Sequence, residues 1–140
     1  MNIERVIEDM ERIRGIRPLK RFMVVDDDHD VVGFMRTILS QRGAVVDAFS
    51  SVEQGIQHLG QDKCNGHCYS RIFVDLSFPQ GKQGTDLLEH VRRSAPNTPI
   101  AIVSGFVTNE LLAEVAELGY SFIYKLASGE DFRHQLEKYL

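Results

Sequence analysis

Short apolar runs alternate with amphipathic stretches along most of the chain. The runs are rich in β-branched and aromatic residues and are bounded by turn-forming residues, which predicts strands buried on both faces. The predicted strands are residues 22–25, 44–48, 71–76, 99–103 and 120–124. Apolar residues at helical spacing predict helices at 30–42, 51–59, 85–95, 109–118 and 129–140. Strands that alternate with helices predict an α/β fold with a parallel sheet and right-handed crossovers.

One further helix precedes this alternating region. Residues 2–14 carry apolar side chains on one face and charged side chains on the other, and Gly15 and Pro18 end the helix. We expect its apolar stripe to pack against the rest of the chain, and the alternative is a contact with a partner or a second copy. The predicted organisation is a helix and linker over residues 1–20 and one domain over residues 21–140.

Length and composition restrict the class of protein. A chain of 140 residues with 43% hydrophobic and 26% charged residues suits one globular domain. The net charge of -4 provides no overall basic footprint for nucleic acid. No apolar run approaches the roughly 18 residues of a membrane span, and the charged N-terminus does not resemble a secretory signal. Two cysteines without such a signal predict free thiols. We therefore expect a cytoplasmic protein that binds neither nucleic acid directly nor a membrane.

Polar residues follow four of the predicted strands. Asp26–Asp28 follow the first strand, Asp75 is at the end of the third, Ser104 follows the fourth and Lys125 follows the fifth. The carboxyl ends of parallel strands meet at one edge of the sheet, where open α/β sheets bind their ligands. We therefore expect these side chains to form a single site, although they lie far apart in the sequence.

The chemistry of this set suits phosphoryl transfer. Clustered carboxylates raise one another's pKa, and Mg²⁺, which prefers oxygen ligands, removes that penalty. Lys125 would neutralise phosphoryl oxygens, and the Ser104 hydroxyl would donate a hydrogen bond to another. Asp75 is predicted to be the nucleophile that becomes an acyl phosphate. The simpler alternative is that Asp75 only caps the turn after its strand.

Together these motifs closely resemble the receiver domain of two-component response regulators. The resemblance covers about residues 21–140, and the order and spacing of its short motifs make it specific. The motifs are Val24–Asp28, Val74–Leu76 with Pro79 and Gly84, Val103–Gly105, and Tyr124–Lys125. The resemblance implies a flavodoxin-like, doubly wound five-stranded parallel sheet with strand order 2-1-3-4-5.

The resemblance also implies a role for the residues at the expected metal site. Asp26 and Asp27 would hold Mg²⁺ together with Asp75 and the backbone carbonyl of Ser77. Asp75 would accept a phosphoryl group from a histidine kinase or a histidine phosphotransfer protein. The domain would catalyse its own phosphorylation and dephosphorylation, and it would not be an enzyme that turns over a separate substrate.

Two further residues are implied as a switch. Ser104 would move toward the phosphoryl group, and Phe122, three residues before the lysine, would rotate into the space it leaves. Phosphorylation adds nearly two negative charges, and the resulting population shift would remodel a face for a downstream protein.

Two positions near the site lead to further predictions from the resemblance. Leu126 stands where the family usually has proline, and a cis bond before leucine costs about 3–4 kcal/mol, so we predict a trans Lys125–Leu126 bond. Phe106 lies two residues beyond the switch hydroxyl. It would screen the acyl phosphate from water, which predicts slow self-dephosphorylation.

Other interpretations of the same residues stay open. Asp28 is predicted to cap a helix rather than to bind metal, and the Cys64–Cys68 segment, which also holds a histidine, matches no common zinc pattern. The spacing of Asp26 and Asp28 fits a haloacid-dehalogenase-type phosphatase, which would leave Asp75 without a role. Two further alternatives are a receiver-like interaction module without phosphotransfer and a fragment of a larger response regulator or hybrid kinase. The sequence leaves the kinase, the output partner and homodimerisation open.

Overall fold

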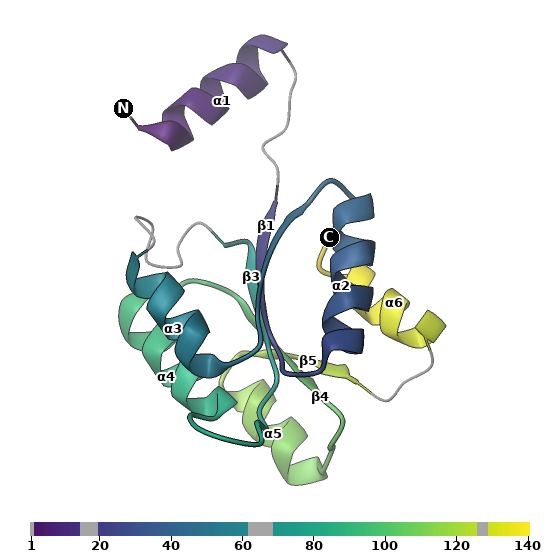
Figure 1. Cartoon of the computed structure of the whole chain (residues 1–140). Helices are drawn as coiled ribbons and strands as arrows, with labels where there is room; N and C mark the ends of the chain where they lie inside the picture. The colour runs from purple at the N-terminus through teal and green to yellow at the C-terminus, as the bar shows by residue number, and fades with distance from the viewer. Residues whose placement is uncertain (1, 15–19, 62–68, 126–128) are drawn as a thin grey trace.

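One parallel sheet forms the centre of the molecule (Figure 1). A computed structural model describes residues 2–14, 20–61, 69–125 and 129–140. The strands are β1 (Arg21–Val25), β2 (Val45–Phe49), β3 (Arg71–Val74), β4 (Ile100–Ser104) and β5 (Ser121–Tyr124). The helices are α1 (Ile3–Arg14), α2 (His29–Gln41), α3 (Val52–Gln61), α4 (Gly84–Ser94), α5 (Asn109–Glu117) and α6 (Gly129–Glu137). The strand order is β2-β1-β3-β4-β5, and every neighbouring pair is parallel, which confirms the predicted topology.

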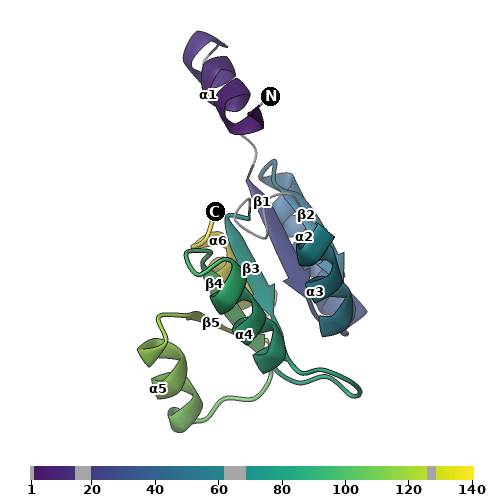
Figure 2. The same ribbon diagram turned by 90° about the vertical axis from the view of Figure 1, so that its left-hand side faces the viewer.

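Helices cover both faces of the sheet (Figures 1 and 2). On one face, Met23 and Val25 of β1 belong to a buried cluster with residues of α3, α4 and α5. On the other face, Phe22 and Val24 belong to a cluster with residues of α2 and α6. Successive side chains of a strand point to opposite faces, so a strand covered on both sides reads as a continuous apolar run. Each fully buried side chain of this kind contributes about 1.5–3 kcal/mol to folding.

The helix ends follow the expected capping chemistry in most places. The Asp28 carboxylate accepts hydrogen bonds from the backbone N–H groups of Asp30 (3.1 Å) and Val31 (3.2 Å) at the start of α2, as predicted. The Thr108 hydroxyl accepts a hydrogen bond from the Leu111 N–H at the start of α5. Helix α4 begins at Gly84, one residue earlier than predicted, because Gln83 occupies the capping position.

Helix α1 stands apart from the sheet and its covering helices in both views (Figures 1 and 2). Asn2 caps it by accepting a hydrogen bond from the Glu4 N–H at 3.0 Å. The apolar side chains of Ile3 and Val6 are 67% and 37% exposed. The expectation that this stripe packs against the same chain is therefore wrong for these two residues. A contact with a partner stays a prediction.

Some expectations fall on parts of the chain outside the described residues. They are the linker at residues 15–19, the Cys64–Cys68 segment, the peptide bond to Leu126 and the Ser128 cap. None of the described helices has the length and apolar composition needed to cross a membrane.

Candidate functional site

The carboxyl ends of β1, β3 and β5 bring two aspartates and a lysine together. The Lys125 Nζ lies 3.0 Å from Asp26 Oδ1 and 3.0 Å from Asp75 Oδ2. The sheet holds all three residues through its backbone, because its ladder continues one residue past each strand. The Asp26 N–H donates to the Phe49 carbonyl at 3.0 Å. The Asp75 N–H donates to the Val25 carbonyl at 3.0 Å, and the Lys125 N–H donates to the Ser104 carbonyl at 2.8 Å. The convergence predicted for these residues is therefore observed.

An acidic cluster surrounds this lysine. Asp26, Asp27 and Asp75 each place one carboxylate oxygen within 4.8 Å of the others. The Asp28 Oδ2 lies 3.9 Å from the Lys125 Nζ, although its Oδ1 caps α2. The lysine therefore neutralises only part of a cluster that carries more negative than positive groups.

Burial sets the electrostatics of the cluster. Asp26 is 2% exposed, and burial is the main cause that raises its pKa to about 6, against the opposing hydrogen bonds from the Asp28 N–H and Lys125. Burial by itself would lower the pKa of Lys125. Hydrogen bonds to Asp26 and Asp75 outweigh that effect and raise the pKa of Lys125 above its ordinary value, so the ammonium form is favoured.

The second carboxylate oxygen of Asp26 is an unusual feature. Asp26 Oδ2 is buried and has no hydrogen-bond partner among the described residues. Buried polar atoms are nearly always paired, and an orphaned oxygen beside two more carboxylates is what a metal ligand leaves when its cation is removed. The all-oxygen donor set fits Mg²⁺, which binds through one or two carboxylates and keeps several waters.

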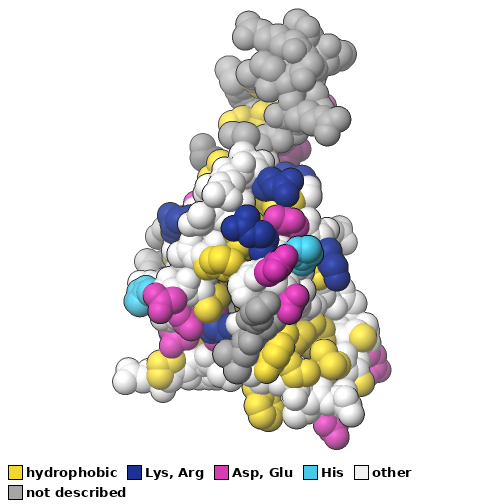
Figure 3. Space-filling view, turned by 90° about the vertical axis from the view of Figure 1, so that its right-hand side faces the viewer, with side chains coloured by type: hydrophobic (Ala, Val, Ile, Leu, Met, Phe, Trp, Pro, Cys, Tyr) yellow, Lys and Arg dark blue, Asp and Glu magenta, His cyan; other side chains and the backbone are white. Residues whose placement is uncertain are grey.

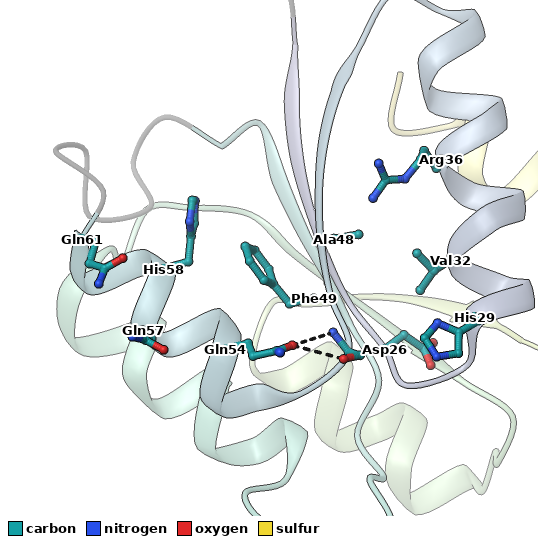
Figure 4. A pocket seen from close by; sticks show the side chains of 11 residues that line it. Asp26, His29, Val32, Arg36, Ala48, Phe49, Gln54, Gln57, His58 and Gln61 are labelled. Carbon is teal, nitrogen blue, oxygen red and sulfur yellow. Dashed lines mark hydrogen bonds between the residues drawn. The ribbon is translucent and has the colours of Figure 1, made fainter.

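A groove of about 580 Å³ borders the cluster between α2 and α3 (Figure 4). Arg36 and Val32 reach into it from α2, and Asp26 forms part of its wall. On the α3 side, the Gln54 carboxamide accepts hydrogen bonds from the backbone N–H and the hydroxyl of Ser50. Asp26 is therefore shared between the acidic cluster and this groove along the edge strand β2.

The remaining predicted residues lie at the end of β4, within β5 and in the loop after β3. Ser104 ends β4 and is buried, and its hydroxyl exchanges two hydrogen bonds with the backbone of Phe106, each at 3.1 Å. Phe122 lies on β5, is partly buried and packs against the cluster on the α3–α5 face. The backbone N–H of Ser77 donates to Asp75 Oδ1 at 3.3 Å. The structure thus places Ser77 within reach of the cluster and Phe122 on the neighbouring edge strand.

Sequence reasoning missed two side chains that hold the loop after β3. Glu53 on α3 accepts a hydrogen bond from the Lys82 N–H at 2.6 Å. The Gln83 carboxamide accepts a hydrogen bond from the Phe78 N–H at 2.9 Å. Both are polar residues in polar surroundings, so periodicity and motif spacing provide no signal for either.

Comparison with known proteins identifies the family. The sequence profile of the response regulator receiver domain matches residues 22–137. The chain belongs to the response regulator receiver domain family. The resemblance that its strand-end motifs indicated is therefore confirmed. Its sheet order and helical layers are those of the CheY-like, flavodoxin-like fold.

Solved structures share the fold of this receiver domain at low sequence identity. Chemotaxis response regulator CheY4 of Vibrio cholerae has 17% identity and a TM-score of 0.71, over 88% of this chain and 100% of that chain. A CheY-like receiver domain protein from Methanospirillum hungatei has 22% identity and a TM-score of 0.67, over 87% and 97%. A response regulator from Burkholderia pseudomallei, solved with a phosphorylated aspartic acid, a calcium ion and citrate, has 22% identity and a TM-score of 0.66, over 84% and 66%. At these identities the likeness concerns the fold.

Proposed function

We propose that this receiver domain accepts a phosphoryl group on Asp75 in a Mg²⁺-dependent reaction. The donor is a phosphohistidine of a histidine kinase or of a histidine phosphotransfer protein. One observation carries the proposal: the Lys125 Nζ lies 3.0 Å from both Asp26 and Asp75, inside a cluster of three carboxylates at the carboxyl edge of the sheet. This arrangement brings together a carboxylate that can act as the nucleophile, the ammonium group of a lysine, and carboxylate oxygens that can bind a metal ion.

The roles follow from the chemistry of each group. Asp26, Asp27 and Asp75, with the Ser77 carbonyl, would hold Mg²⁺, which neutralises phosphoryl oxygens and aligns the donor when it is bound. A carboxylate oxygen of Asp75 forms a bond to phosphorus while the bond from phosphorus to the donor imidazole nitrogen breaks. The Lys125 ammonium then exchanges part of its contact with the carboxylate for a contact with a phosphoryl oxygen.

The switch uses the residues at the end of β4 and on β5. In the unphosphorylated domain the Ser104 hydroxyl is occupied by the Phe106 backbone. A phosphoryl oxygen is a stronger acceptor, so the hydroxyl would turn toward it, and Phe122 would follow into the space. The size of the shift depends on the difference in these contacts between the two states.

The surface beside the switch suits a protein partner. Figure 3 shows hydrophobic side chains gathered at the lower end of that face, toward α5 and the end of β5. Exposed hydrophobic residues of this region are Phe106 (71%), Leu112 (39%) and Tyr124 (39%). Exposed apolar patches mark interaction sites. The partner is a downstream protein, and a second copy of the domain is the alternative. The expected location of this signalling step is the cytoplasm, and the domain acts alone or within a larger regulator or hybrid kinase.

Intact-mass measurement with acetyl phosphate and Mg²⁺ tests the proposal. We expect the mass of one phosphoryl group to be added to the wild-type domain, and not to Asp75→Asn or in the presence of a chelator. Asp30→Asn, which removes an exposed carboxylate at the start of α2, is the matched control and should still be modified. Phosphotransfer from a phosphorylated kinase provides the same test with the proposed donor.

Each other outcome of that measurement excludes a specific part of the proposal. A domain that never gains the added mass is a receiver-like interaction module. If the Asp75→Asn variant gains the mass of a phosphoryl group, the acceptor is a different residue. Continuous release of phosphate from phosphoesters would favour the phosphatase interpretation, which the use of the Asp28 Oδ1 as a helix cap already disfavours.

A further inference from the structure

The loop between β3 and α4 contains an internal clamp. Figure 2 shows this connection extending beyond the carboxyl end of the sheet. The Gln83 carboxamide contacts the backbone of Phe78 twice, because its Oε1 accepts from the Phe78 N–H at 2.9 Å and its Nε2 donates to the Phe78 carbonyl at 3.0 Å. The same Nε2 also lies 3.2 Å from the Gly81 carbonyl. Phe78 itself is only 8% exposed and packs in the core cluster on this face of the sheet.

The clamp acts on the peptide group that contains the Ser77 carbonyl. The Phe78 N–H and the Ser77 C=O belong to the same planar unit, and in a trans peptide they point in opposite directions. An acceptor that fixes the direction of the N–H therefore fixes the direction of the carbonyl. A hydrogen bond to the N–H also polarises the amide and makes its oxygen a better ligand.

We propose that Gln83 is a positioning residue that aims the Ser77 carbonyl at the metal site. The inference rests on the proposed function, in which that carbonyl is a ligand of Mg²⁺. Gln83 itself is not a ligand. It acts through one peptide group, as outer-shell partners do when they orient the ligands of a metal.

The position of Gln83 is itself tied to the nucleophile. Its backbone N–H donates to Asp86 Oδ2 at 2.7 Å in the first turn of α4. The next residue is Gly84, where a Cβ atom would overlap the carbonyl oxygen of Asp75. Helix α4 therefore starts in direct contact with the backbone of Asp75, and the clamp links the two ends of the loop that carries Ser77.

Two substitutions separate the clamp from helix capping. Gln83→Met keeps the length of the side chain and removes its hydrogen bonds. Gln83→Asn keeps a good capping residue but is one methylene too short to reach Phe78. Gln80→Met changes an exposed glutamine of the same loop and is the matched control. The Mg²⁺-free unfolding transition of each variant establishes that it is folded.

The first measurement is Mg²⁺ binding by titration calorimetry on the full chain. We expect the dissociation constant to rise about tenfold in both Gln83 variants, as is typical when an outer-shell partner is removed, and to stay unchanged in the Gln80 variant. The second measurement is spectroscopic. The ¹³C shift of the Ser77 carbonyl should respond to Mg²⁺ in the wild-type domain and respond less in the Gln83 variants. In the absence of metal, the Phe78 amide hydrogen should exchange with solvent faster in the Gln83 variants than in the wild-type domain.

The outcomes distinguish this inference from the function on which it rests. A wild-type domain that binds no Mg²⁺ contradicts the proposed function and with it the metal ligand. If the wild-type domain binds Mg²⁺ and the Gln83 variants bind it equally well, only the role of Gln83 is overturned. Weaker binding with an unchanged exchange rate at Phe78 also overturns it, because the effect would not pass through that N–H.

Discussion

The buried carboxyl group of Asp26 predicts a pH dependence of stability that is specific to the metal-free domain. Burial raises its pKa from 3.8 to about 6. Between those two values the folded protein holds a proton that the unfolded chain has released, so the free energy of unfolding falls as pH rises. At about 1.4 kcal/mol for each pH unit, the change amounts to about 3 kcal/mol.

Urea denaturation of the wild-type domain and of Asp26→Asn, followed by circular dichroism with a chelator present, measures this contribution. Other groups titrate in both proteins, so the difference between the two unfolding free energies isolates Asp26. We expect the difference, wild type minus variant, to fall by about 3 kcal/mol from about pH 4 to pH 7. Saturating Mg²⁺ should remove the fall, because the cation pairs with the ionised carboxylate.

Asp47 provides a control of opposite sign. Burial alone would raise the pKa of Asp47, but hydrogen bonds from Tyr69 and Arg21 outweigh it and lower that pKa. The stability of the wild-type domain relative to Asp47→Asn should therefore rise with pH below about pH 4, where the unfolded chain holds a proton that the folded protein has released, and should stay level at higher pH. If the Asp26 difference were constant between pH 4 and pH 7, or rose with pH in that range, the reasoning about burial at the cluster would be refuted.

Three further predictions concern packing, a buried hydrogen bond and the lifetime of the phosphorylated state. Gly84→Ala should lower the free energy of unfolding by about 1–3 kcal/mol in urea denaturation, because the added methyl group overlaps the Asp75 carbonyl; a stability equal to wild type would contradict the close packing. Tyr69→Phe should cost about 1.5 kcal/mol in the same assay, because Tyr69 is buried and donates to Asp47 Oδ2 at 2.6 Å; no loss would mean that water replaces the bond. Phe106→Glu should shorten the lifetime of the phosphoryl group severalfold when the modified mass is followed over time, and an unchanged lifetime would rule out screening by this side chain.

The sequence by itself determined the fold class and the convergence of three candidate site residues at one edge of the sheet. Apolar runs separated by amphipathic stretches require strands covered on both faces, and that requirement produces a parallel sheet with helical crossovers. Asp26, Asp75 and Lys125 each follow such a run, so the topology places them at one edge. These features can be predicted from the sequence because they depend on local patterns. The spacing of apolar residues indicates which faces are buried, and the residue after each strand lies at the carboxyl edge of the sheet.

Only the tertiary structure decided the contacts within and around the site. Three features depend on packing between segments: the position of the Lys125 ammonium between two carboxylates, the buried oxygen of Asp26 without a partner, and the Gln83 clamp on Phe78. The exposure of Ile3 and Val6 on α1 is of the same kind, because an amphipathic pattern specifies that a face be covered and not what covers it. The physical reason is that hydrogen bonds and desolvation depend on distances of a few tenths of an ångström between residues remote in the chain, which no local pattern records.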